Sequence, residues 1–235
     1  MQTAYTIFPL GDSALTIDFG NRMDESLNEK VLQLYHRLQH FSPVIKDLLP
    51  AYSSLTIYYD VAALHTKSLS AFEAAKRLIE PLIFEGNTTA LPLKRQLRIP
   101  VCYAGNYGPD LANMATQKNL AVEELIQLHT GRPYRVYMIG FLPGFPYMGK
   151  VHERLATPRK NQPRTSVPAG SVGIAGEQTG IYPLASPGGW NIIGRTPLPL
   201  FDPEKEEPVL FQPGDEVLFY SITEDEFDNY QSRHS

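Results

Sequence analysis

The amino-acid sequence predicts an α+β protein in which a small open sheet with helices is followed by a β domain. Two observations support this prediction. Up to about residue 88, segments of strand-like alternation are interleaved with segments of helical periodicity. From residue 134 onward the helical periodicity ends, and glycine and proline separate short apolar runs, as is typical of a closed or sandwiched β domain. We therefore expect two domains, residues 1–88 and 96–235, with the polar stretch 85–94 as the candidate linker.

The first domain combines strands with two amphipathic helices. Asp24 is a plausible N-cap for the first helix, whose apolar side chains recur at helical spacing. Pro81 should end or kink the second helix, because proline lacks the N–H that a helix needs. The order β-β-α-β-β-α-β indicates a small open sheet with its helices on one face. The expected strands include residues 5–10, 14–20, 53–60 and 95–103, and the expected helices are residues 24–40 and 68–84.

Two short helices precede the β domain. Residues 108–119 have Pro109 in a first-turn position, and residues 121–131 end at Gly131, which is typical of a helix C-terminus. Such a pair can form a helix-turn-helix, but a module that reads DNA needs a basic face. The chain carries a net charge of −4 and contains no basic run, so the sequence argues against nucleic-acid binding.

Composition argues against several other classes of protein. The start of the chain lacks the charged and apolar regions of a signal peptide, and no apolar run approaches the ~18 residues of a membrane helix. We therefore expect a cytoplasmic protein. The single cysteine, Cys102, rules out an internal disulfide and is expected to be a core thiol. The six histidines show no metal-ligand spacing, so no metal site is expected.

Residues 140–149, with the sequence GFLPGFPYMG, place three aromatic rings among three glycines and two prolines. Glycine is costly to fix and proline breaks regular hydrogen-bond ladders, so such a segment suits a loop. Two interpretations are open at this point. Either the rings cap a hydrophobic core, or they form a rigid apolar rim around a binding site.

Residues 156–197 form a basic stretch in a chain that is acidic overall. Guanidinium groups suit the bidentate binding of carboxylate or phosphate, and Ser166 and Gln178 could add neutral hydrogen bonds. The alternative is a run of hairpins whose basic side chains lie on a solvated edge. The stretch contains Arg159, Lys160, Arg164 and Arg195 against a single acid, Glu177.

Two further side chains are candidates for a site. His129 lies at the C-terminus of an expected helix, where the helix dipole favours the charged imidazolium, and it precedes the aromatic segment. Trp190 follows Pro187, Gly188 and Gly189. It is either a core side chain or a platform on which a ligand stacks, and the sequence leaves both alternatives open.

Taken together, residues 134–149, 158–197 and 211–219 resemble the PxpB/KipI family, also called the allophanate hydrolase subunit 1 family. The resemblance extends over about residues 5–222. It implies a small N-terminal α/β domain followed by a cyclophilin-like β barrel. It also implies a subunit of the bacterial 5-oxoprolinase complex, which uses ATP to convert 5-oxoproline to L-glutamate. The implied partners are a PxpC-type subunit and a PxpA-type subunit of the LamB/YcsF class.

The resemblance leaves the function itself open between classes. Some members of that family are described as inhibitors of a sporulation histidine kinase, and related domains occur in urea carboxylase. A module that binds a histidine kinase, and a subunit of a urea- or allophanate-type enzyme, are therefore the alternative functions, because fold does not settle function.

The resemblance also implies a groove on the barrel, lined by the aromatic segment and faced by the basic stretch. The residues expected to bind substrate there are Phe141, Pro143, Phe145, Tyr147, Trp190 and Arg195. The residues expected to act in catalysis are Arg159, Lys160, Arg164, Ser166, Gln178 and His129. We expect Arg164 to be exposed, so that its replacement lowers activity with little effect on folding.

The implied reaction is phosphorylation of the substrate's amide oxygen by ATP, followed by attack of water. Within residues 156–197, Glu177 is the sole candidate for a general base. This incomplete set favours a site shared between subunits, in which a partner chain supplies the base or holds ATP with its Mg²⁺.

Overall fold

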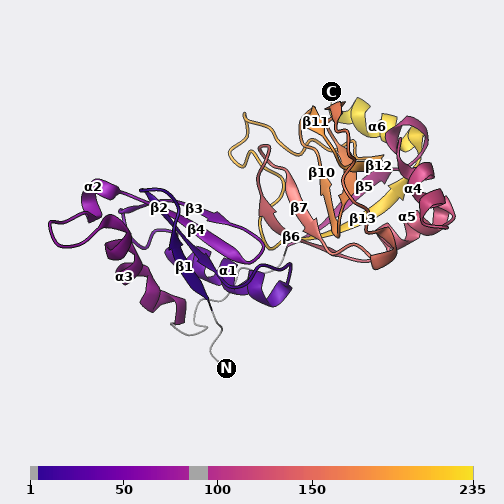
Figure 1. Ribbon diagram of the computed structural model, residues 1–235. Coiled ribbons are helices and arrows are strands. Elements are labelled where there is room, and N and C mark those ends of the chain that lie inside the picture. Colours follow the sequence, from indigo (N-terminus) through magenta and orange to yellow (C-terminus); the bar gives the residue numbers. More distant parts are fainter. Residues whose placement is uncertain (1–4, 85–94, 235) are drawn as a thin grey trace. The chain divides into compact units, whose positions relative to one another are not determined.

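The computed structural model describes residues 5–84 and 95–234, and it divides into two compact units, residues 1–94 and 95–235 (Figure 1). Each unit has its own hydrophobic core, and the two are described separately. The linker expected at residues 85–94 lies outside the described residues. Among the helices that are described, none is long and apolar enough to cross a membrane.

The first unit is an antiparallel sheet with the strand order β1-β2-β4-β3. Leu15 and Ile17 on β2, with Leu55 and Ile57 on β4, pack with α1 and α3 into one core, so both helices lie on the same face of the sheet. The predicted open sheet is thus confirmed. Its elements are β1 (Thr6–Pro9), β2 (Ala14–Asp18), α1 (Glu25–Leu38), β3 (Ile45–Pro50), β4 (Ser54–Tyr59), α2 (Val61–Leu64) and α3 (Ala71–Phe84).

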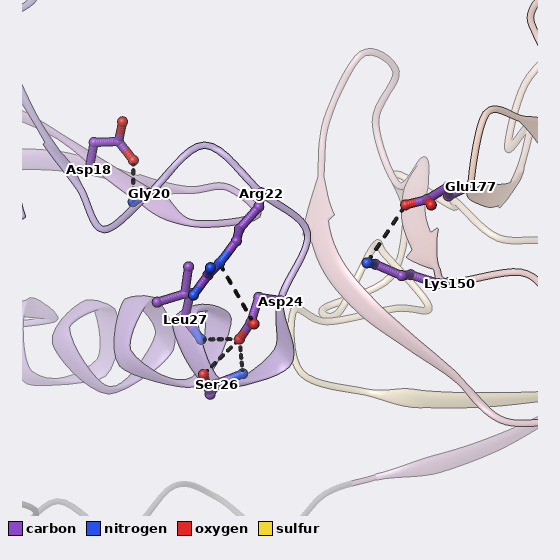
Figure 2. A network of polar contacts seen from close by, with 8 residues as sticks. All are labelled: Asp18, Gly20, Arg22, Asp24, Ser26, Leu27, Lys150 and Glu177. Atoms are coloured by element: carbon purple, nitrogen blue, oxygen red, sulfur yellow. Dashed lines mark hydrogen bonds and ion pairs between the residues drawn. The ribbon is translucent and has the colours of Figure 1, made fainter. Parts of the chain in front are cut away.

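The ends of the two long helices test two expectations. Asp24 is the N-cap of α1, as predicted: its Oδ1 accepts hydrogen bonds from the backbone N–H of Ser26 at 2.9 Å and of Leu27 at 3.1 Å (Figure 2). Pro81, by contrast, does not end α3, which continues to Phe84. Pro81 is exposed and lies in the last turn, where few backbone bonds of the helix remain to be lost.

The second unit is a closed barrel with the strand order β10-β7-β6-β13-β5-β12-β9, which confirms the predicted β domain. β8 and β11 form a separate two-stranded sheet. The strand bounds are β5 (Gln96–Cys102), β6 (Tyr134–Ile139), β7 (Pro146–Gly149), β8 (Arg164–Val167), β9 (Ser171–Ala175), β10 (Gln178–Ile181), β11 (Ser186–Gly188), β12 (Asn191–Arg195) and β13 (Glu216–Ile222).

β5 corrects the expected strand order. The order of elements along the chain assigned it to the first sheet, but β5 pairs in parallel with β13, from Gln96 beside Glu216 to Cys102 beside Ile222. A parallel partner has to come from a distant part of the chain, so strand order along the sequence gives no sign of this pairing. Cys102, at the end of β5, is a buried core thiol as expected.

The helices of the second unit are α4 (Leu111–Gln117), α5 (Val122–Thr130) and α6 (Glu224–His234), with 3₁₀ turns η1 (Gly105–Tyr107) and η2 (Glu153–Leu155). α4 packs against α5 and β12, while α5 also packs against β13 (Figure 1). α4 begins at Leu111, two residues after Pro109, so Pro109 precedes the helix and does not lie in its first turn, and Asp110 occupies the N-cap position. Asp110 does not cap the helix with its side chain, which points instead to the site described below.

Candidate functional site

The strands β7, β9 and β12 carry apolar side chains on both faces. On β9, Val172 and Ile174 belong to the main core inside the barrel, whereas Ala175 belongs to a second cluster. On β12 the neighbours Ile193 and Ile192 divide in the same way. Because successive side chains of a strand point to opposite faces, the second cluster lies on the outer face of the barrel wall. Its buried members are Phe145, Val167, Ala175, Tyr182, Trp190 and Ile192.

Half of the buried members of this cluster are aromatic, and Phe145 lies at the centre of the rings. The distances from the Phe145 ring centre to the neighbouring ring centres are 5.7 Å to Phe141, 4.8 Å to Tyr147, 5.2 Å to Tyr182 and 5.4 Å to Trp190. Most of these pairs meet edge to face, the geometry that aromatic quadrupoles favour. We call Phe141, Phe145, Tyr147, Tyr182 and Trp190 the outer aromatic cluster.

The glycine-rich segment before β7 has the backbone that this packing requires. Phe141 and Gly144 have positive φ angles, 69° and 80°, and the Phe145 N–H donates to the Leu142 carbonyl at 3.0 Å, which closes a tight turn. On the neighbouring strand β10, a Cβ at Gly180 would lie 2.9 Å from the Phe145 ring. The turn exposes 63% of Phe141 while it buries Phe145. Phe145 therefore packs in a hydrophobic cluster, as the first interpretation expects, whereas Phe141 is exposed, and its part in a binding site stays a prediction.

A buried carboxylate, Asp110, holds two cations of the basic stretch. Its Oδ1 lies 2.8 Å from the Lys160 ammonium and 2.7 Å from Nη2 of Arg164. Its Oδ2 accepts a 2.7 Å hydrogen bond from the backbone N–H of Ile192 on β12. Burial by itself raises the pKa of Asp110, but the hydrogen bonds from Arg164 and Lys160 outweigh it and hold the pKa below its usual value. Asp110 is therefore ionised and paired at neutral pH.

Residues 158–164, which we call the basic loop, are tied to the start of β12. The Lys160 N–H donates to the Gly189 carbonyl at 2.8 Å, and the Asn191 side-chain amide donates to the Pro158 carbonyl at 2.9 Å. Between these two ties, the Arg159 guanidinium carbon lies 5.9 Å from the centre of the Trp190 ring, within cation–π range. Arg159 is exposed, whereas only 5% of Trp190 is.

The charge of Arg159 acts on two tyrosine hydroxyls of the outer aromatic cluster. Burial raises the pKa of Tyr147, and the positive charge of Arg159 opposes that shift. The pKa of Tyr182 is likewise raised by burial, against the hydrogen bond from the Trp190 N–H and the charge of Arg159. An exposed cation beside a half-buried phenol and an aromatic wall can bind a small ligand that has both a carboxylate and a carbonyl.

The structure brings most of the expected substrate-binding residues together, with differences in exposure. Phe141, Phe145, Tyr147 and Trp190 share one cluster, and Pro143 is exposed in the turn beside them. Arg195 is not part of this cluster. It lies at the other end of β12, about 16 Å of strand away from Trp190. There its Nε donates to the Ala169 carbonyl at 2.7 Å and its guanidinium lies over Phe227.

The residues expected to act in catalysis lie in different parts of the barrel unit. Arg159, Lys160 and Arg164 belong to the basic loop. Ser166 is exposed on β8, and Gln178 begins β10 on the face shared with Gly180. The expectation that Arg164 is an exposed side chain is wrong, because only 29% of it is accessible and its Nη2 is bound to Asp110.

His129 differs from the expectation of a charged imidazolium. It is fully buried in the barrel interior, its ring stacks on Phe219 at 4.6 Å, and both nitrogens have hydrogen-bonding partners. Nδ1 lies 2.8 Å from the Tyr103 hydroxyl, and Nε2 lies 3.1 Å from the Thr179 hydroxyl. Burial lowers the pKa of His129 to about 3, so the ring is neutral at physiological pH. Desolvation therefore outweighs the helix dipole that favoured the charged form.

Glu177, the sole candidate base of the basic stretch, lies in the turn between β9 and β10. It is exposed, and its carboxylate lies 3.7 Å from the ammonium group of Lys150 (Figure 2). Among the described residues, no group of three or more His, Cys, Asp or Glu side chains could hold a metal ion.

Asp110 is the residue of this site that sequence reasoning missed. An aspartate directly before a helix is typical of an N-cap, so the local sequence favours a capping role. Its actual partners lie 54 residues away at Arg164 and 82 residues away at Ile192, and only the closed barrel brings them together.

Comparison with known proteins gives one consistent result. The family described as "Carboxyltransferase domain, subdomain C and D" matches residues 5–211. The B-type 5-oxoprolinase subunit of Bacillus subtilis (strain 168) is 44% identical over 238 residues, which cover 98% of this chain and 98% of that protein. The corresponding 5-oxoprolinase subunit of Escherichia coli O157:H7 is 40% identical over 89% of this chain and 93% of its own length.

A solved structure, that of TTHA0988, has a similar fold. It matches with a TM-score of 0.77 at 38% sequence identity, over 89% of this chain. The match covers 40% of the TTHA0988 chain, so the present chain spans less than half the length of that solved protein.

Proposed function

The chain belongs to the PxpB/KipI family, the family of the B-type 5-oxoprolinase subunits, and from this membership we propose that it is one subunit of an ATP-dependent 5-oxoprolinase complex. The complex would open 5-oxo-L-proline to L-glutamate. The observation that carries this proposal is the 44% identity over nearly the whole of both chains with the 5-oxoprolinase subunit of Bacillus subtilis. The proposed partners are a PxpC-type subunit and a PxpA-type subunit of the LamB/YcsF class.

The substrate's chemistry fits the groups around the outer aromatic cluster. 5-Oxoproline is a five-membered lactam with a carboxylate, so it presents an anion, an amide carbonyl and an apolar ring edge. In the proposed arrangement, the exposed guanidinium of Arg159 binds the carboxylate, and the Phe141 and Tyr147 rings contact the lactam ring. The Tyr147 hydroxyl is the proposed donor to the amide oxygen. A charge-assisted hydrogen bond of the Arg159 kind is worth ~1.5–3 kcal/mol.

The lactam amide is a poor electrophile, and ATP supplies the activation in this proposal by phosphorylating the amide oxygen. The described residues do not fit a Mg²⁺ site of their own, because they contain no cluster of acidic or histidine ligands. We therefore assign ATP with its Mg²⁺ to the assembled complex and derive no step through the ion. The part proposed for this chain is to bind and orient the substrate, not to carry out the reaction alone.

Reconstitution tests the proposal. The purified chain is mixed with candidate PxpC-type and PxpA-type subunits, ATP and 5-oxoproline, and the release of glutamate and ADP is followed. We expect turnover that requires this chain, its partners and ATP together. Full activity of this chain alone, or none with all partners present, would contradict the proposal. Capture of a histidine kinase without any second subunit would favour the inhibitor function instead.

A further inference from the structure

Two aspartates in the barrel unit, Asp110 and Asp215, each form an ion pair with an arginine, and they differ in which segments of the chain they connect. Asp215 forms a bidentate pair with Arg95, with distances of 2.9 and 2.8 Å, and also accepts from the Gln212 N–H at 2.7 Å. Asp215 thus pairs with a single cation, and it lies next to the start of β13. Because β13 is three strands away from both β9 and β10 in the closed barrel, Asp215 lies on the side opposite the outer aromatic cluster.

Asp110 instead joins three segments of the chain. Lys160, the residue after Arg159, and Arg164, the last residue of the basic loop, both pair with Asp110, and the Ile192 N–H anchors the strand that follows Trp190. The Asp110 N–H in turn donates to the Ile192 carbonyl at 2.9 Å. The approach is close, since a Cβ at Gly108 would lie 2.3 Å from the Ile193 carbonyl oxygen. The two hydrogen bonds with Ile192 thus fix Asp110 to β12 independently of either cation.

The charges around Asp110 indicate which cation is left for a ligand. Lys160 and Arg164 share one carboxylate oxygen, so both are already engaged. Within the part of the chain that the structure describes, Arg159 makes no ion pair, and it is the most exposed of the three. Nη1 of Arg164 is buried without a hydrogen-bond partner among the described residues and its Nη2 is bound to Asp110, so this guanidinium is less open to a ligand than that of Arg159.

We propose that Asp110 is a positioning residue, which holds the basic loop against the start of β12 so that Arg159 stays over Trp190 as the cation that meets a ligand's carboxylate. The identity of that ligand as 5-oxoproline rests on the proposed function. The position of Arg159 does not, because it follows from contacts within this chain: those of Asp110 and the two hydrogen bonds that tie Pro158 and Lys160 to the start of β12. Asp110 itself touches no ligand in this proposal.

The first experiment uses the full chain without partners. Trp190 is the sole tryptophan, so the intrinsic fluorescence of the chain reports on the site directly. Asp110→Asn keeps the shape of the side chain and removes its charge. We expect a red shift of the Trp190 emission and stronger quenching by acrylamide, because the loop over the ring loosens. Asp215→Asn is the matched control: it breaks a buried carboxylate–arginine pair in the same unit and should leave the emission unchanged.

The second experiment uses the reconstituted complex. A misplaced binding group weakens substrate binding, so Asp110→Asn should raise KM for 5-oxoproline by about tenfold. A merely destabilised subunit would instead lower the active fraction and hence kcat, with KM unchanged, which is the pattern expected for Asp215→Asn. If the wild-type complex has no activity, the proposed function fails, and the fluorescence of the isolated chain still decides the role of Asp110.

Three outcomes would overturn the role of Asp110. One is a lower melting temperature of Asp110→Asn with wild-type Trp190 emission. Another is an equal emission shift in Asp110→Asn and Asp215→Asn, since that would reflect general loosening of the barrel. If Asp110→Asn does not fold, Lys160→Met and Arg164→Met each remove one anchor of the loop, and wild-type emission in both variants would be the third.

Discussion

The guanidinium carbon of Arg159 lies 5.9 Å from the centre of the Trp190 ring, at the edge of a cluster of aromatic side chains on the outside of the barrel. This contact combines an exposed charge with a buried platform. The contact holds the guanidinium in place but leaves its positive charge unpaired, because the indole ring attracts a cation through its π face and carries no negative charge of its own. Arg159 is therefore both fixed in place and able to bind an anion.

Replacement of Arg159 should affect binding more than folding. We expect Arg159→Gln to raise KM of the reconstituted complex at least about tenfold, the effect of losing one charge-assisted contact. The melting temperature should change little, since an exposed arginine contributes little to stability. Arg154→Gln is the matched control, because Arg154 is an exposed arginine paired with Glu124 outside the cluster. A normal KM in Arg159→Gln would remove Arg159 from the site.

Replacement of Arg164 should lower stability as well as activity. Arg164→Ala leaves Asp110 with Lys160 as its remaining cation and removes a short buried contact, so we expect the free energy of unfolding to fall by about 1–3 kcal/mol. Arg164→Lys should restore part of this loss, because it keeps the charge but not the planar fork. Urea unfolding of the three chains measures the effect. Unchanged stability of Arg164→Ala would mean that the pair with Asp110 is not maintained in solution.

Much of the fold could be predicted from local patterns. The helical spacing of α1 and its N-cap at Asp24 are properties of adjacent residues, and so are the short apolar runs of the barrel. The position of β5 could not be predicted, because its parallel partner β13 lies more than 100 residues further along the chain. Local pattern thus predicts the elements, but not the pairing of strands that are distant in sequence.

The candidate site shows the same division. The aromatic segment and the basic loop stand out by composition, and both belong to the site. Sequence could not show that Phe145 is enclosed while Phe141 is exposed, because the same turn with its positive φ angles separates them. Nor could it show that His129 is enclosed by Tyr103, Thr179 and Phe219. Burial is a property of the closed barrel. For His129 it lowers the pKa, whereas the position at a helix C-terminus was expected to favour the charged ring.

Gly180 should not tolerate a side chain. A Cβ there would lie 2.9 Å from both the Phe145 ring and the Pro146 carbonyl oxygen, which is backbone and cannot turn away. We expect Gly180→Ala to lower the free energy of unfolding by about 1–3 kcal/mol, as overpacking does, and to shift the Trp190 emission through Phe145. Gly140→Ala is the control, since its Cβ would meet the Met138 side chain at an ordinary 3.7 Å. Equal stability of the two variants would contradict the packing described for Phe145.

The buried His129 makes a pH-dependent contribution to stability. Its pKa is about 3 in the folded chain, against an ordinary value of 6.5, so the unfolded chain binds one more proton than the folded chain between these values. A folded state that binds fewer protons loses stability as the pH falls. The contribution is complete above about pH 6.5 and is lost progressively as the pH falls toward 3.

Removal of the imidazole should therefore flatten the acid limb of the stability curve. We expect the free energy of unfolding of wild type to fall between pH 6 and 4 by about 1.4 kcal/mol per pH unit more than that of His129→Gln, which is the slope for one proton. Urea unfolding at a series of pH values measures both slopes. Thr179→Val is the control: it removes the hydroxyl partner of Nε2 and lowers stability at every pH, but it keeps the imidazole and hence the slope. Equal slopes in wild type and His129→Gln would mean that the imidazole is not buried as a neutral ring.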